Sequence, residues 1–313
     1  MAFTIAEAFA PASMGNVGIG FDILGLAFAE PGDIVRAEWR DAPGAVMLRI
    51  EGDNGLLPLD PAKNTACVAA NHVLHTLQAK RGVGLTLFKH LPLASGLGSS
   101  AASAVAAAVA VNALLGSPLG MSELLPACLA GEACVSGYHA DNVAPSLLGG
   151  IVLVEGTDAS SIRHLPVPAR LHLGLFTPAI EVPTAEARAV LPDVVPLKAV
   201  VRQTAGVAAF VDALHRGDIA AMGQAMEQDH IIEPARRQLI PHLEAARRTA
   251  RQVGAYGVVI SGAGPTLCAV CDDADVAKVA AQAMQDVYDD AGIAGVAYST
   301  TVGMHGARVI ALE

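Results

Sequence analysis

The chain has 313 residues, which is enough for roughly two domains, and 53% of them are hydrophobic while 16% are charged. This composition predicts a large buried core and excludes a disordered chain. The formal net charge of −10 and the aromatic content of 4% argue against binding to nucleic acid or to an acidic membrane surface.

The cellular compartment is predicted from three features of the sequence. The N-terminal segment Met-Ala-Phe-Thr-Ile-Ala-Glu lacks the basic start and the apolar stretch of a secretory signal. Residues 101–115 form the most apolar run, which is too short to span a bilayer. Five cysteines, an odd number, lie in apolar contexts. Reduced thiols, a cytoplasmic location and no membrane partner are therefore expected.

Apolar periodicity predicts the elements in chain order. In the first half, strands are expected at 4–10, 33–39, 46–51, 84–89 and 151–155, and helices at 64–78, from Ser100 to about 116, and at 122–136. In the second half, helices are expected at 184–191, 197–215, 217–229, 241–252 and 276–288, and strands at 171–176, 256–260, 267–271, 294–302 and 308–312. The polar segment 157–168 predicts a boundary between domains 1–160 and 161–313. Because strands and helices intermix without a regular βαβ period, the fold class is α+β.

A glycine- and serine-rich loop, Pro92-Leu-Ala-Ser-Gly-Leu-Gly-Ser-Ser100, leads into the apolar helix. The free N–H groups and positive dipole at a helix start bind phosphate, and glycines let the backbone approach the anion closely. The loop lacks the Gly-Lys-Ser/Thr ending of a Walker A motif. Since no Lys or Arg occurs between Lys89 and Arg163, phosphate binding would rest on backbone dipoles and a metal. The alternative is an ordinary turn with a good helix cap.

Two segments in the first half place polar residues among apolar ones. In the glycine-rich stretch 11–22, Asn16 and Asp22 are candidates to face a ligand, or else form a self-satisfied hairpin loop. Glu132 lies on a mainly apolar helix face with no cation near it in sequence, which suggests a divalent cation as its partner, unless the carboxylate lies at the helix edge and faces water.

Three polar residues, His139, Asp141 and Asn142, follow the predicted helix that carries Glu132. His139 and Asn142 are candidates for ligand contact and Asp141 for orienting its neighbours, while the alternative is a helix terminus with capping residues. The second half supplies cations: Arg188 and Arg236 suit a carboxylate, although both could be surface charges.

Taken together, these stretches resemble the GHMP kinase superfamily, whose three motifs appear in order around Asn16, at residues 92–100, and at Ser261-Gly-Ala-Gly-Pro265. Within the superfamily the chain looks like the homoserine kinases, on residues 16–25, 139–145, 184–192 and 233–241. Mevalonate and galactose kinases would carry a catalytic aspartate where Asn142 stands. The catalytic base is left open, with Asp141 the nearest carboxylate in sequence.

The resemblance implies a GHMP kinase fold, with an N-terminal domain like the second domain of ribosomal protein S5 and a ferredoxin-like C-terminal domain. It implies that Asn64 lies near adenine, that Ser100 and Glu132 hold Mg²⁺, and that Asn16, Asp141 and Thr184 serve catalysis. The ATP phosphates would contact Pro92, Leu93, Ala94, Ser95, Gly96, Leu97, Gly98, Ser99, Ser100, Ala101 and Ala102. The residues expected to bind L-homoserine are Asn16, Asp22, His139, Asn142, Arg188, Arg236 and Gly262.

The predicted activity is ATP-dependent phosphorylation of the L-homoserine hydroxyl, a step of threonine biosynthesis, and a homodimer is what the resemblance allows. Phosphoryl transfer needs little covalent help from the protein, so the open question of a base does not argue against a kinase. Three alternatives are another small-alcohol kinase of the superfamily, an inactive member that senses a ligand, and a binding module that takes no nucleotide.

Overall fold

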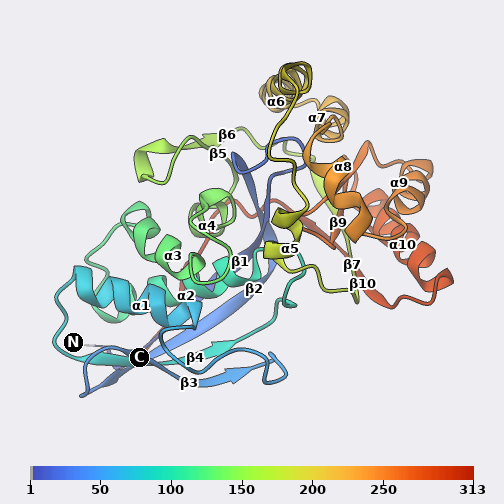
Figure 1. Ribbon diagram of the computed structural model, residues 1–313. Coiled ribbons are helices and arrows are strands. Elements are labelled where there is room, and N and C mark those ends of the chain that lie inside the picture. Colours follow the sequence, from blue (N-terminus) through green and yellow to red (C-terminus); the bar gives the residue numbers. More distant parts are fainter. Residues whose placement is uncertain (1–2) are drawn as a thin grey trace.

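Two β-sheets with helices packed against them make up the computed structural model, which describes residues 3–313 (Figure 1). The seven-stranded sheet contains β1 (Ile5–Gly15), β2 (Leu24–Arg40), β3 (Ala45–Glu51), β4 (Gly82–Phe88), β5 (Ile151–Val154), β6 (Ile162–Leu165) and β11 (Arg308–Leu312). The four-stranded sheet has the order β10 (Gly295–Thr301), β7 (His172–Pro178), β9 (Leu267–Cys271) and β8 (Gly257–Ile260), and all its pairs are antiparallel.

The helices divide between the two sheets (Figure 1). Those in the first half of the chain are α1 (Thr65–Thr76), α2 (Ser99–Leu114), α3 (Leu125–Glu132) and α4 (Ala140–Leu148). Those in the second half are α5 (Thr184–Ala189), α6 (Leu197–Arg216), α7 (Ile219–Met226), α8 (Ile232–Arg236), α9 (Leu243–Gln252) and α10 (Ala274–Asp290). Three short 3₁₀ helices are η1 (Met121–Leu124), η2 (Ala159–Ser161) and η3 (Arg237–Leu239). The α+β prediction is confirmed.

The predicted elements are present with shifted ends, but α4, α8 and β6 were not expected. Helix α4 contains Pro145 in its interior, and proline disfavours that position in a helix. Strand β6 pairs only with β5. Its two central residues, Arg163 and His164, are polar and exposed, so the segment lacks the apolar pattern of a buried strand. The seven-stranded sheet takes β6 and β11 from beyond residue 160, so a boundary at 160/161 separates them from the strands with which they pair.

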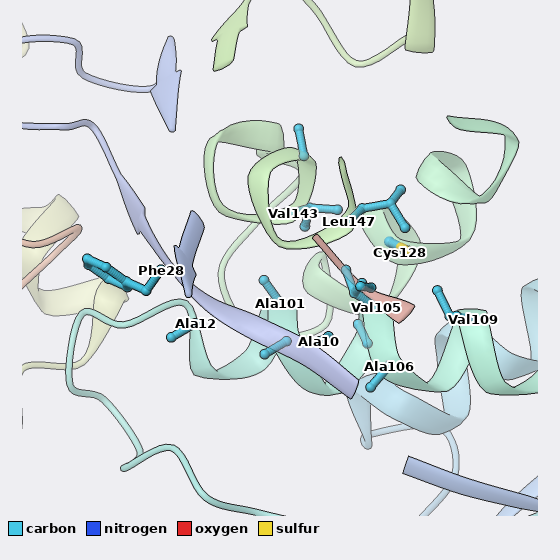
Figure 2. Packing of buried hydrophobic residues seen from close by; sticks show 14 of the residues in the cluster. Ala10, Ala12, Phe28, Ala101, Val105, Ala106, Val109, Cys128, Val143 and Leu147 are labelled. Atoms are coloured by element: carbon cyan, nitrogen blue, oxygen red, sulfur yellow. The ribbon is translucent and has the colours of Figure 1, made fainter. Parts of the chain in front are cut away.

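Helix α2 is the centre of the larger core. It is apolar around its whole circumference, and every residue except Ser100 is buried, as expected for a helix with no polar face. In Figure 2 its residues Ala101, Val105, Ala106 and Val109 lie among side chains from β1, β2, α3 and α4. Because eleven of its sixteen positions are Ala or Ser, the neighbouring backbones can approach closely.

A buried ion pair secures the first turn of α2. The Lys89 ammonium donates to the Asp33 carboxylate at the centre of β2, and both side chains are inaccessible to solvent. Lys89 Nζ also donates to the carbonyl of Ser99, at 2.7 Å, and to Ser103 Oγ, at 2.9 Å. Burial lowers the pKa of Lys89, and the Asp33 carboxylate opposes that shift. Three acceptors therefore surround this ammonium, as a buried charge requires.

Backbone hydrogen bonds bring the three sequence motifs together at one end of the sheets. The N–H of Ser13 in β1 donates to the carbonyl of Leu97, at 3.0 Å, and the N–H of Gly262 donates to the carbonyl of Gly15, at 3.2 Å. Ser261 Oγ donates to the carbonyl of Gly96, at 2.7 Å. The glycine- and serine-rich loop 92–100 thus contacts both sheets. Within residues 3–313, no helix has the length and apolar character needed to cross a membrane.

We predict that Lys89→Met lowers the free energy of unfolding by about 3–5 kcal/mol, because it leaves the buried Asp33 charge without its partner. The matched control is Arg49→Met, which removes the exposed ion pair between Arg49 and Glu51 and should cost less than about 1 kcal/mol. Urea unfolding of both variants measures the difference. Equal losses in the two variants would contradict the importance of the buried pair.

Candidate active site

A cavity of about 370 Å³ opens where the loops of the two sheets meet, between the start of α2 and α5. Most of the residues singled out in the sequence line it, from both halves of the chain. They are Asn16, Asp22, Asn64, Leu93, Ala94, Ser95, Gly96, Gly98, Ser99, Ser100, Glu132, His139, Asp141, Asn142, Thr184, Arg188, Arg236 and Gly262.

Four residues predicted to contact ATP are not among those that line the cavity. Leu97 is buried in the core, and Ala101 and Ala102 lie in the first turn of α2 with their side chains buried. Pro92 is exposed at the start of the loop. Helical geometry explains the alanines, because a helix start presents its N–H groups rather than its methyl groups along the axis.

The start of α2 has the geometry of an anion site. Its N-cap, Gly98, adopts the left-handed conformation with φ of 62°, and no side chain caps the helix. A Cβ on Gly98 would lie 2.0 Å from Ser13 Oγ, so only glycine lets the loop pack here. The helix start lines the cavity through Gly98, Ser99 and Ser100, and the alternative of an ordinary turn with a side-chain cap is not what the structure shows.

Glu132 and Ser100 lie beside this helix start and have the character of a partial metal site. Glu132 is buried at the end of α3; one carboxylate oxygen accepts from Ser100 Oγ at 3.0 Å, while Oε2 is buried with no hydrogen-bond partner. Burial raises the pKa of Glu132, and the Ser100 hydrogen bond opposes the shift. The alternative of a carboxylate that faces water at the helix edge is therefore not what the structure shows.

The donor set at Glu132 fits Mg²⁺ that arrives with a nucleotide. Mg²⁺ is commonly bound by one or two carboxylates or hydroxyls while phosphate oxygens and waters complete its coordination. Across residues 3–313 there is no cluster of three or more His, Cys, Asp or Glu side chains arranged to hold a metal. A cation here would therefore depend on ligands from the substrate as well as on the unpaired oxygen of Glu132.

The opposite wall of the cavity carries charges of both signs. Arg188 in α5 binds Asp22 through two hydrogen bonds of 2.7 and 3.1 Å, and His139 Nδ1 lies 3.6 Å from Asp22. His139 is the N-cap residue of α4, but its side chain makes no capping bond. Burial lowers the pKa of His139, partly opposed by Asp22. Asp22 is therefore paired with a residue from the second half of the chain rather than within its own loop.

Arg236 and Asn16 both bind the turn between β8 and β9. Arg236 Nη1 and Asn16 Nδ2 donate to the carbonyl of Gly262, at 3.0 and 2.9 Å. Asn16 Oδ1 accepts from the backbone N–H of Asp22, so both polar ends of this amide have backbone partners. Arg236 is buried, and burial lowers its pKa, with the neighbouring Arg188 charge acting in the same direction.

Asp141 and Asn142 lie in the first turn of α4. Asn142 Oδ1 accepts from Ser13 Oγ and from the N–H of Gly15, which fixes α4 against β1. A Cβ on Gly15 would lie 2.3 Å from the Asp141 carboxylate, so glycine makes room for it. Burial raises the pKa of Asp141 to about 7, and the charges of Asp22 and Glu132 add to the shift. This carboxyl titrates near neutral pH, as a general base requires.

Sequence reasoning missed two cationic residues at the cavity: Lys63, whose side chain is exposed, and Lys89, whose ammonium is buried against Asp33. Lys89 ends the predicted strand 84–89, shortly before the loop, and that position was the signal in the sequence that could have identified it.

The Asn64 side chain caps α1 through the N–H groups of Ala66 and Cys67, and its amide donates to the carbonyl of Pro58. Both its polar groups are thus engaged in positioning α1 at the cavity wall.

Comparison with known proteins gives consistent results. The chain matches the family models for the GHMP kinases N terminal domain, over residues 64–150, and GHMP kinases C terminal, over residues 210–290. It is 42% identical to the homoserine kinase of Chloroherpeton thalassium, covering 90% of this chain and 91% of that protein. It is 41% identical to that of Arabidopsis thaliana, covering 98% and 85%.

Solved structures give the same picture. The crystal structure of homoserine kinase from Cytophaga hutchinsonii matches with a TM-score of 0.94 and 42% identity, over 98% of this chain and 97% of that one. The structure of mevalonate kinase from L. major matches with a TM-score of 0.71 at 19% identity, over 96% and 97%, which shows a shared fold.

We predict that the difference in free energy of unfolding between Asp141→Asn and the unmodified protein shifts in favour of the variant as the pH rises. The native state holds the Asp141 proton up to about pH 7, whereas the unfolded chain releases it near pH 4. Between these values the native state binds more protons than the unfolded chain, so the unmodified protein loses stability as the pH rises. The amide introduced by Asp141→Asn does not titrate, so the variant does not lose this stability. Urea unfolding at pH 5 and pH 8 measures this.

The matched control is Asp290→Asn at the exposed end of α10, for which the difference from the unmodified protein should be the same at both pH values. A pH-independent difference for Asp141→Asn would contradict the raised pKa.

Proposed function

Because the chain belongs to the homoserine kinase family of the GHMP kinases, we propose that it transfers the γ-phosphoryl group of ATP to the side-chain hydroxyl of L-homoserine. The product, O-phospho-L-homoserine, would serve threonine biosynthesis. One observation carries the proposal: a single cavity combines an uncapped helix start, a buried carboxylate with a free oxygen, and charges of both signs facing them.

The nucleotide end of the cavity is proposed to lie at the start of α2. The N–H groups after Gly98 would hold the phosphates, and Lys63, at the cavity rim, would add a cation. Ser100 and Glu132 would hold Mg²⁺, which when bound supplies positive charge that neutralises the phosphate oxygens. Thr184, at the start of α5, would lie near the transferred group.

The amino-acid end is proposed to lie between Asp22 and the two arginines. A zwitterionic substrate offers an ammonium for Asp22 and a carboxylate for Arg188 and Arg236, which suits the charge pattern of the cavity. His139 and Asn142 would border the substrate, and Asn16 would hold the Gly262 turn against it. The substrate would thus be oriented by both sheets.

Asp141 is proposed to take the proton. The hydroxyl oxygen of the substrate forms a bond to the γ-phosphorus, its proton passes to a carboxylate oxygen of Asp141, and the bond to the bridging oxygen breaks with its electron pair leaving on ADP. A pKa of about 7 for Asp141 is matched to this task near neutral pH. Positioning and charge neutralisation would supply most of the rate.

A cytoplasmic location is part of the proposal. Its support is that Cys67, Cys128, Cys134, Cys268 and Cys271 are all free thiols, which suit a reducing compartment. A homodimer stays a prediction of the family resemblance.

The experiment is ADP release measured with ATP, Mg²⁺ and, in separate reactions, L-homoserine, L-serine, L-threonine, mevalonate and galactose. We expect strong stimulation of ADP release by L-homoserine alone. L-serine and L-threonine carry their hydroxyl one carbon closer to the ammonium and carboxylate, and mevalonate and galactose lack the ammonium. Stimulation by mevalonate or galactose would overturn the substrate assignment. Measurable ATP binding without turnover would favour a ligand sensor instead.

One test variant and one control variant examine the proposed metal site alongside this substrate panel. Glu132→Gln should lower kcat at least about 100-fold, since it removes the charge proposed to hold Mg²⁺. The thermal stability should not fall, because burial disfavours the charged carboxylate that the substitution removes. Glu186→Gln, on the exposed face of α5, should leave kcat within about twofold. Full activity in Glu132→Gln would remove this residue from the metal site.

A further inference from the structure

Phe21 links the two arginines of the candidate active site. It lies in the turn between β1 and β2, next to Asp22, and its side chain is partly buried. The guanidinium carbon of Arg188 lies 5.4 Å from the centroid of the Phe21 ring, and that of Arg236 lies 5.3 Å from it. One aromatic ring therefore contacts cations from α5 and from α8.

Two guanidinium groups this close to one ring repel each other and need compensation. Arg236 obtains part of it from the carbonyls of Ala187 and Gly262, and Arg188 from Asp22. Arg188 Nε is nevertheless buried without a hydrogen-bond partner. The negative face of an aromatic ring supplies further attraction for a cation, and it does so without carrying a charge.

The neutrality of the ring matters for a zwitterionic substrate. If the substrate ammonium binds Asp22, this carboxylate no longer compensates the charge of Arg188 as it does in the free protein. A second carboxylate beside the arginines would compete with the substrate carboxylate for them. An aromatic face keeps the guanidinium planes in place and leaves their positive charge available for the ligand.

We infer that Phe21 is a positioning residue that holds Arg188 and Arg236 together as a carboxylate clamp, and that it thereby sets the preference for amino acids over the corresponding amino alcohols. The inference rests on the proposed function of the same cavity. A space-filling role in the loop would require only an apolar side chain of similar volume, whereas a clamp requires the aromatic face.

The experiment compares Phe21→Leu and Phe21→Tyr with L-homoserine and with the amino alcohol that carries CH₂OH in place of its carboxylate. For Phe21→Leu we expect KM for L-homoserine to rise about tenfold, from the loss of two cation–π contacts, with kcat and KM for ATP within about twofold. KM for the amino alcohol should be unchanged, and Phe21→Tyr should restore KM for L-homoserine.

The matched control is Phe9→Leu. Phe9 is partly buried like Phe21 and contacts Arg308, 4.3 Å from its ring centroid, on strands away from the cavity. Its KM values should equal those of the unmodified protein. An equal rise of KM for both substrates in Phe21→Leu, or an unchanged KM for L-homoserine, would overturn the clamp. If the unmodified protein phosphorylates neither compound, the proposed function fails instead.

A second measurement keeps the shape of the side chain constant. Incorporation of 4-fluoro- and then 3,4,5-trifluorophenylalanine at position 21 weakens the negative face of the ring stepwise while the ring remains in place. The clamp predicts that KM for L-homoserine rises with each step and that KM for the amino alcohol does not. A KM for L-homoserine that is flat across the series would overturn it, whether or not Phe21→Leu folds.

Discussion

Helix α2 has no charge along its length and is buried on every side, so its first turn has only the cavity to face. The Lys89 ammonium binds the carbonyl of Ser99 beneath this turn and is itself held by Asp33 in β2. The helix start is thus fixed to the seven-stranded sheet, and its N–H groups are oriented before any ligand arrives. Such preorganised dipoles are what phosphoryl transfer requires from a protein.

The second sheet completes the site through the turn around Gly262. The carbonyl of Gly262 accepts from both Asn16 and Arg236, and the N–H of the same residue donates to the carbonyl of Gly15. One peptide turn therefore fixes Arg236 and the end of β1 together. Because the proposed substrate end takes residues from both halves of the chain, a small shift of this turn would separate the reacting groups.

Local patterns in the sequence predicted the features that depend on neighbours along the chain. The glycine- and serine-rich loop predicted the buried helix that follows it, and the apolar neighbours of Glu132 placed that residue on an apolar helix face. The ion pairs that hold the site together could not be found this way, because Asp22 and Arg188 are 166 positions apart and Asp33 and Lys89 are 56 apart. The raised pKa of Asp141 likewise depends on charges that only the folded chain brings close to it. The sheet that combines β1 with β11 joins the two ends of the chain, as Figure 1 shows, and local patterns carry no signal for such a pairing.

A crystal structure of the protein with Mg²⁺, a non-hydrolysable ATP analogue and L-homoserine tests the proposed site most directly. We expect the phosphates to contact the N–H groups after Gly98, Ser100 and Glu132 to hold the metal, and the substrate hydroxyl to lie within hydrogen-bond distance of Asp141. Phosphates bound elsewhere in the cavity, or a hydroxyl turned away from Asp141, would contradict the proposed site.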